Sequence, residues 1–190
     1  VPIDEKHPYN PQSPYAASKA AADHLALSYY RSFGTPVTII RPFNTYGPRQ
    51  SARAIIPTIV TQVLSGKTQI KLGNLAPTRD LNYVKDITNG FITVGLHEKT
   101  IGDVYNIGSG REISIGDLAQ KIVDLIGKSV EIVQDEQRIR PQKSEVERLL
   151  CNADKASKLT GWEPKYTLDE GLKETIEWIK DNMGYYKPDI

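Results

Sequence analysis

Segments with helical periodicity alternate with short runs of β-branched residues along the whole chain, and this alternation restricts the fold more than any other feature. Apolar spacing and capping residues predict helices over residues 13–32, 54–65, 86–97, 114–127, 154–160 and 167–179. Short apolar runs between them predict strands over residues 37–40, 69–72, 82–84, 103–110 and 129–133. A chain in which helices and strands alternate in this way is predicted to adopt an α/β fold.

The charge balance and the cysteine content exclude several classes of partner. The 190 residues carry 24 basic and 23 acidic side chains, and a net charge of +1 gives no electrostatic footprint for nucleic acid or an anionic membrane. No apolar run is long enough to span a bilayer. The single cysteine, Cys151, excludes an internal disulfide and favours a cytoplasmic location, and three widely spaced histidines argue against a metal site.

The stretch SPYAASKAA opens the first predicted helix and carries a candidate catalytic pair. Ser13 is a favourable N-cap, Pro14 suits the first helical position, and Gly34 ends the helix. Tyr15 and Lys19 are four residues apart and share one helix face, where an ammonium group stabilises a phenolate that can act as a general base. Because chance is expected to give about one such spacing in this chain, a solvent-exposed pair without catalytic role is the alternative.

Longer blocks around this pair resemble one enzyme family. The blocks are SPYAASKAAADHLALSYYRSFGTPVTIIRPFNTYGPRQ, TRDLNYVKDI, DVYNIGSGREISIGDLAQ, IRPQKSEVERLL and NADKASKLTGWEPKYTLDEGLKETIEW. In this order they resemble the extended short-chain dehydrogenases/reductases, and among these the nucleotide-sugar 4,6-dehydratases and epimerases. The resemblance implies a partial NAD-binding Rossmann domain, made of its C-terminal strands and helices, over residues 1–50. A small α/β substrate domain would take residues 51–190, and residues near 80–110 are candidates for returning to the Rossmann domain.

The resemblance implies a cofactor site on the first helix and the strand after it. Tyr15 would take the proton from the sugar 4-hydroxyl while C4 gives a hydride to NAD⁺. Lys19 would hydrogen-bond the nicotinamide ribose and stabilise the phenolate. Pro42 and Phe43 would line the nicotinamide side of this site.

Polar side chains that contact the nucleotide sugar are also implied. Asn44 would meet the diphosphate or the sugar, and Arg79 and Arg140 would each donate paired hydrogen bonds to phosphate oxygens. The residues alone leave alternatives open. Asn44 can satisfy its own turn, and Arg79 can form an ion pair with Asp80 or Asp86.

Two apolar residues and two further arginines have weaker assignments. Ile70 and Leu72 would flank the nucleobase by resemblance, although a core role fits them equally well. Arg49 and Arg53 lie in the loop that follows Asn44, where they can contact a phosphate or remain solvated. The four residues QKSE after Pro141 depart from the glycine and aspartate that are frequent in the family, so the side chain that meets the ribose is not identified.

The segment NIGSGREISIG has the spacing of a dinucleotide-binding motif without completing it. Gly108 and Gly110 stand at the exit of a predicted strand, but Ile113 stands where the motif needs its third glycine. We therefore interpret this segment as a structural turn ahead of a helix.

The sequence lacks several parts that a complete enzyme of this family needs. It contains no Gly-rich βα turn for the pyrophosphate, and the family's Ser/Thr partner of the catalytic tyrosine and its acidic pair for elimination would lie upstream of Val1. We expect a C-terminal portion, inactive alone, of an NAD-dependent nucleotide-sugar 4,6-dehydratase. The complete enzyme would oxidise C4, eliminate water across C5 and C6, and return the hydride to C6.

The expected substrate is a UDP- or GDP-linked N-acetylhexosamine, and the expected assembly is a homodimer through the helix that carries Tyr15. The nearest alternative is a nucleotide-sugar 4-epimerase, which uses the same Tyr15 and Lys19 and returns the hydride to C4. An alternative from another class is a non-catalytic nucleotide-sugar-binding fragment.

Overall fold

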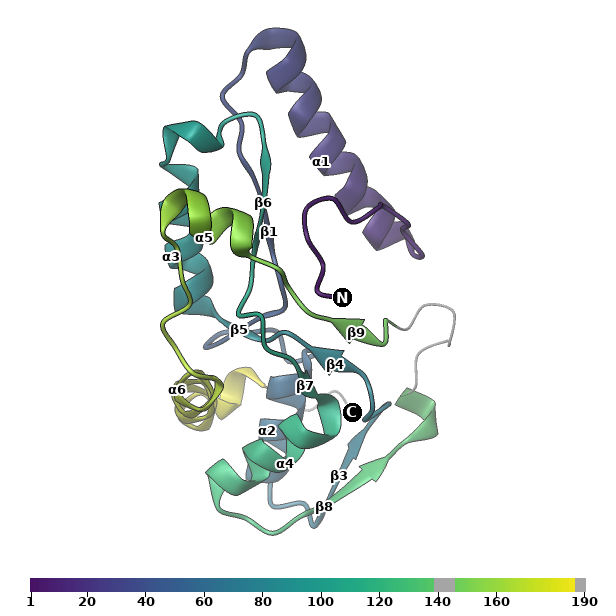
Figure 1. Ribbon diagram of the computed structural model, residues 1–190. Coiled ribbons are helices and arrows are strands. Elements are labelled where there is room, and N and C mark those ends of the chain that lie inside the picture. The colour runs from purple at the N-terminus through teal and green to yellow at the C-terminus, as the bar shows by residue number, and fades with distance from the viewer. Residues whose placement is uncertain (139–145, 187–190) are drawn as a thin grey trace.

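The computed structural model describes residues 1–138 and 146–186, and it confirms the α/β class (Figure 1). One part of the molecule is built on two parallel strands, β1 (Ile39–Pro42) and β6 (Val104–Ile107). Helices α3 (Val84–Gly95) and α5 (Asp154–Thr160) pack on these strands around a small core cluster that includes Ile107 and Trp162. Strand β1 begins two residues later than the apolar run suggested, because the chain pairs with β6 only from Ile39 onward.

A second part is built on three helices and a parallel strand pair. Helices α2 (Ile55–Leu64), α4 (Ile115–Ile126) and α6 (Leu168–Asp181) pack together and bury the larger core cluster. Strands β3 (Gln69–Leu72) and β8 (Glu131–Gln134) pair beside them. The helix ends are fixed by local chemistry: Ser114 caps α4, Gly127 ends it at φ 73°, and Thr167 and Glu170 form a capping box on α6.

Short strands and single turns connect these two parts. Strand β2 (Thr45–Tyr46) pairs with β5 (Asn82–Tyr83), and β4 (Thr78–Arg79) lies between β7 (Ile113–Ser114) and β9 (Arg148–Leu149). The 3₁₀ turns are η1 (Glu98–Thr100), η2 (Glu136–Arg138) and η4 (Met183–Tyr185). Most of these elements have no counterpart in the sequence prediction, because two or three residues cannot display a periodicity.

A buried carboxylate holds the turn after β6. Asp80 is fully buried, and its two oxygens accept hydrogen bonds from the amide of Asn82, the backbone N–H and hydroxyl of Ser109, and the backbone N–H groups of Gly110 and Cys151, at 2.7–3.1 Å. One side chain therefore joins the end of β4 to the turn that follows β6 and to the segment after β9. This arrangement supports the structural interpretation of the NIGSG turn.

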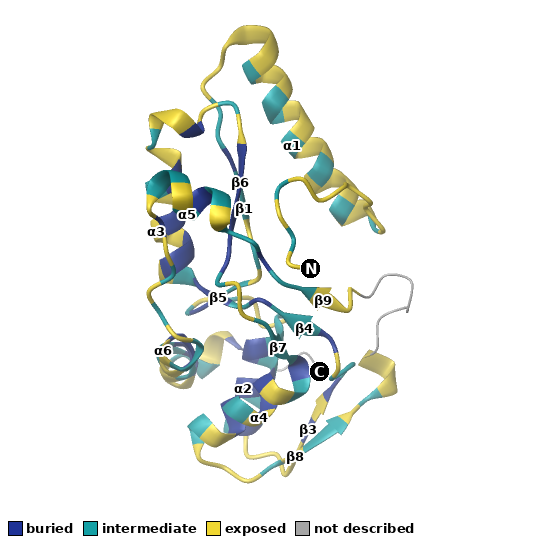
Figure 2. Cartoon of the chain, viewed as in Figure 1, coloured by how far each residue is buried: buried dark blue, intermediate teal, exposed yellow. Residues whose placement is uncertain are grey.

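Helix α1 (Pro14–Phe33) stands beside the β1–β6 pair and buries none of its residues (Figures 1 and 2). Its ends follow the sequence prediction: the Ser13 hydroxyl accepts from the Ala16 N–H at 3.1 Å, and Gly34 ends the helix at φ 68°. An ion pair attaches it to β1, with Arg41 Nε 2.7 Å from the Asp23 carboxylate. In the parts of the chain that the structure describes, no helix is long and apolar enough to cross a membrane.

Candidate functional site

A cavity of about 410 Å³ lies between β3, β4 and the start of α2. We call it the basic cavity because of the residues that line it. Four basic residues line it, Arg53, Lys71, Arg79 and Arg138, and no acidic residue of the described chain is among its lining. Its other polar residues include Asn44, Thr45, Gln50, Thr58 and Asn74. Arg138 also forms an ion pair with Asp135, with Nε 3.4 Å from the carboxylate. A cavity lined by basic residues favours an anionic ligand.

Two of the predicted substrate residues meet in this cavity from different elements. Asn44 follows β1, and its backbone oxygen accepts from the Asn82 N–H at 2.8 Å, which fixes the start of the loop. Arg79 lies on β4, and its Nη1 donates to the Thr78 oxygen at 2.8 Å. Asp80 and Asp86, the alternative partners considered for Arg79, each accept hydrogen bonds from backbone groups. Asp86 accepts the backbone N–H groups of residues 165 and 166, and Asp80 holds the turn described above.

The two predicted nucleobase contacts separate in the structure. Both Ile70 and Leu72 point from β3 toward the core, but only Leu72 also borders the basic cavity. Ile70 is fully buried and belongs to the core cluster, which is the alternative that the sequence left open. Arg140 lies outside the residues that the structure describes.

Sequence reasoning did not identify most of the lining residues, and three of them illustrate how the lining depends on tertiary contacts. Lys71 lies on β3 between two inward residues, and Arg138 is brought in by η2. Gly73 permits this approach, because a Cβ at that position would lie 2.6 Å from the Arg138 carbonyl oxygen. Gln50 is the third: its Nε2 donates to the Thr45 oxygen at 3.0 Å, and its buried Oε1 has no hydrogen-bond partner among the described residues.

The predicted catalytic pair lies on α1 and does not line the basic cavity. Tyr15 is 72% exposed, and Lys19 Nζ lies 5.6 Å from the centroid of its ring, so the two side chains share one face as predicted. Pro42 and Phe43 lie at the carboxyl end of β1, where the Phe43 N–H donates to the Ile107 oxygen at 2.9 Å. Ligands of open α/β sheets bind at this end of the strands.

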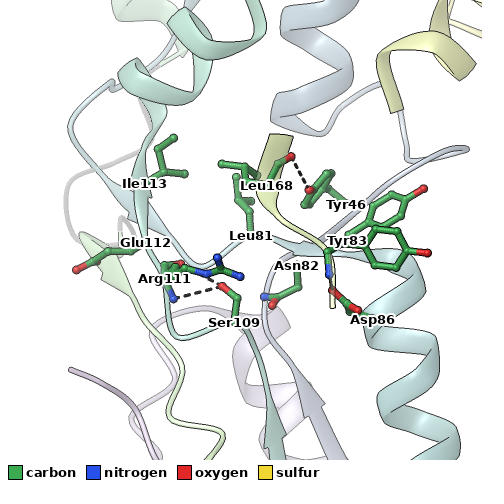
Figure 3. Close-up of a pocket in the computed structure, with 11 residues that line it drawn as sticks. Tyr46, Leu81, Asn82, Tyr83, Asp86, Ser109, Arg111, Glu112, Ile113 and Leu168 are labelled. Carbon is green, nitrogen blue, oxygen red and sulfur yellow. Dashed lines mark hydrogen bonds between the residues drawn. The ribbon is translucent and has the colours of Figure 1, made fainter. Parts of the chain in front are cut away.

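A second, smaller cavity of about 150 Å³ lies between β5, the turn after β6 and the start of α6 (Figure 3). Tyr46 donates its hydroxyl to the Leu168 oxygen at 3.1 Å, and Tyr83 donates to Glu174 at 2.6 Å. Burial raises the pKa of both phenols above the ordinary value, so both stay protonated near neutral pH. Both phenols therefore serve as hydrogen-bond donors within the fold.

Comparison with known proteins identifies a single family. The family model described as GDP-mannose 4,6 dehydratase matches residues 1–175. A dTDP-glucose 4,6-dehydratase of Streptomyces antibioticus is 34% identical over 184 residues, which are 97% of this chain and 54% of the relative. A putative UDP-glucose 4-epimerase of Methanocaldococcus jannaschii is also 34% identical, over 96% of this chain and 58% of the relative.

Solved structures agree with the sequence comparison. The crystal structure of dTDP-glucose 4,6-dehydratase from Bacillus anthracis in complex with NAD superposes with a TM-score of 0.86 at 37% identity. The match covers 99% of this chain and 58% of that structure. The chain thus spans about half the length of the curated relatives that it matches.

Proposed function

Because the chain belongs to the GDP-mannose 4,6-dehydratase family of extended short-chain dehydrogenases/reductases, we propose that the whole protein is an NAD-dependent nucleotide-sugar 4,6-dehydratase. Its substrate is a UDP- or GDP-linked N-acetylhexosamine. The 190 residues of this chain supply the nucleotide-sugar site and the catalytic tyrosine. By themselves they do not catalyse the reaction.

The basic cavity is the observation that carries this proposal. A nucleoside diphosphate sugar has a charged diphosphate between two uncharged groups, and the cavity has the matching pattern. Arg53, Arg79 and Arg138 supply cations, the forked guanidinium groups suit phosphate oxygens, and Leu72 offers an apolar edge to a base. Asn44 lies at the side of the cavity that β1 leads into, where the sugar would point toward the cofactor.

The described residues fit the nicotinamide and its ribose, which are one part of NAD. Lys19 and Tyr15 present an ammonium and a phenol from one exposed helix face, and Pro42 and Phe43 lie at the strand end where such cofactors bind. When bound, NAD accepts a hydride and can return it. Tyr15 takes the proton from the sugar 4-hydroxyl, and Lys19 stabilises the phenolate and orients the ribose.

The exposed face of α1 supports the proposal of a homodimer. Leu25, Tyr29 and Phe33 are between 51% and 75% exposed, and the rings of Tyr29 and Phe33 lie 5.5 Å apart. An apolar stripe on a helix with no buried residue is suited to covering by a second copy of the helix.

The reaction type is tested with purified full-length protein, NAD⁺ and UDP-N-acetylglucosamine. We expect a product that has lost one water and carries a 4-keto group, detected by mass spectrometry of the nucleotide sugar. An epimer of unchanged mass would replace the dehydratase proposal by the 4-epimerase alternative, which the relative from Methanocaldococcus jannaschii favours.

Substrate binding is tested separately by Arg79→Ala. We expect UDP affinity, measured by isothermal titration calorimetry, to fall about 10- to 100-fold, because charge-assisted hydrogen bonds to phosphate are lost. Arg31→Ala removes the same charge from an exposed position in the last turn of α1 and should leave UDP affinity unchanged. Equal affinity in the Arg79→Ala variant would contradict the assignment of the cavity. UDP binding by a full-length protein that does not bind NAD⁺ would instead support a non-catalytic nucleotide-sugar-binding protein.

A further inference from the structure

The loop of residues 47–54, between β2 and α2, separates two cavities. The basic cavity lies on one side of this loop, and Gln50 and Arg53 line it. On the other side is an aromatic cleft of about 540 Å³, lined by Arg49, Gln50, Ser51, Ala52, Trp178, Asn182, Tyr185 and Tyr186. Gln50 borders both cavities. A group in the cleft that holds Gln50 in place therefore also holds the loop residues that line the basic cavity, Arg53 among them.

Tyr186 makes this contact from the end of the described chain. Its side chain is almost fully buried, and its hydroxyl donates to the backbone oxygen of Gln50 at 3.0 Å. The ring meets Trp178 edge to face, with centroids 5.9 Å apart, so its direction is set by α6. Burial raises the pKa of Tyr186, which keeps the phenol in its hydrogen-donating form.

The loop has a conformation that needs such support. Arg49 has φ 67°, in the left-handed region that residues other than glycine rarely adopt. The next residue is held at three points: its N–H donates to the Gly47 oxygen at 3.3 Å, its amide to the Thr45 oxygen, and its own oxygen accepts from Tyr186. A rare backbone conformation persists only where its surroundings determine it.

We propose that Tyr186 is a positioning residue for the substrate: it holds the 47–54 loop so that Arg53 faces the diphosphate in the basic cavity. The inference rests on the proposed function, because it needs a nucleotide in that cavity. It assigns a role in binding to Tyr186, which lines the aromatic cleft and does not line the basic cavity.

The test compares UDP and uridine binding by full-length Tyr186→Phe with binding by a matched variant, Tyr185→Phe. Tyr185 is 80% exposed and also lines the cleft, but its hydroxyl makes no hydrogen bond that the structure records among the described residues. We expect Tyr186→Phe to weaken UDP binding about three- to tenfold, the effect of one hydrogen bond. Uridine binding, and both affinities in Tyr185→Phe, should stay at the level of the unsubstituted protein.

A double-mutant cycle with Arg53→Ala separates positioning from a general loss of stability. If Tyr186 acts through Arg53, adding Tyr186→Phe to Arg53→Ala should not weaken UDP binding further. A fall in melting temperature at unchanged UDP affinity would overturn the inference and leave the proposed function standing. Equal loss of UDP and uridine affinity, or full additivity with Arg53→Ala, would also overturn it. Absence of UDP binding by the unsubstituted protein would overturn the proposed function first.

Discussion

Replacing Tyr15 by phenylalanine is expected to lower kcat of the full-length enzyme by about 10²- to 10⁴-fold, the range for loss of a general base. The phenol oxygen is the only group removed, and the ring beside Lys19 remains. UDP affinity should not change, because Tyr15 does not line the basic cavity. The measurement is steady-state turnover of UDP-N-acetylglucosamine, with UDP binding by calorimetry in parallel.

The matched control is Tyr29→Phe on the same helix. Tyr29 is 51% exposed and its ring contacts Phe33, so removing its hydroxyl tests the loss of a phenol on α1 away from Lys19. Turnover by this variant should be close to that of the unsubstituted enzyme. If Tyr15→Phe retains turnover within a factor of a few, the tyrosine is an exposed helical residue, and the catalytic assignment is wrong.

Replacing Asp80 by alanine is expected to destabilise the fold by at least about 3 kcal/mol, because several buried donors lose their acceptor and each costs about 1–3 kcal/mol when left unpaired. These donors come from the turn after β6 and from the segment after β9, which Asp80 joins. Urea unfolding followed by circular dichroism measures the change in the free energy of unfolding.

Asp124→Ala provides the comparison for Asp80. Asp124 is an exposed carboxylate on α4 whose partner is the amide of Gln120 at 2.8 Å. Surface substitutions of this kind change stability by less than about 0.5 kcal/mol. A loss below about 1 kcal/mol in Asp80→Ala would mean that the turn after β6 is held by its backbone alone.

The helices could be predicted because their ends are determined locally. Ser13 and Gly34 for α1, and Thr167 for α6, act on their own backbone neighbours, and the structure confirms each of these ends. The short strands β4, β7 and β9 could not be predicted in the same way. They form only because residues more than 30 positions apart in the sequence pair with one another, and local sequence patterns do not indicate such pairing.

The candidate site shows the same division. The positions of Asn44 and Arg79 followed from the family resemblance, and the structure brings both to one cavity. Lys71 and Arg138 join them only through the pairing of β3 with β8 and the following turn, so their contribution was not visible in sequence. For Ile70 and Leu72, alternation along a strand could show that both face inward, but not that only one lies at the edge of the core.

Helix α1 is held by its caps and by the Asp23–Arg41 ion pair, with no side chain in a core. Isolated helices gain little stability in water, so its amide protons should exchange with solvent at a far lower opening free energy than those of α2 or α4. If Tyr15 is the base, the reactive group lies on a helix that buries none of its residues. Catalytic competence would then depend on what docks against α1, and both a second copy of the helix and the remainder of a longer protein are candidates.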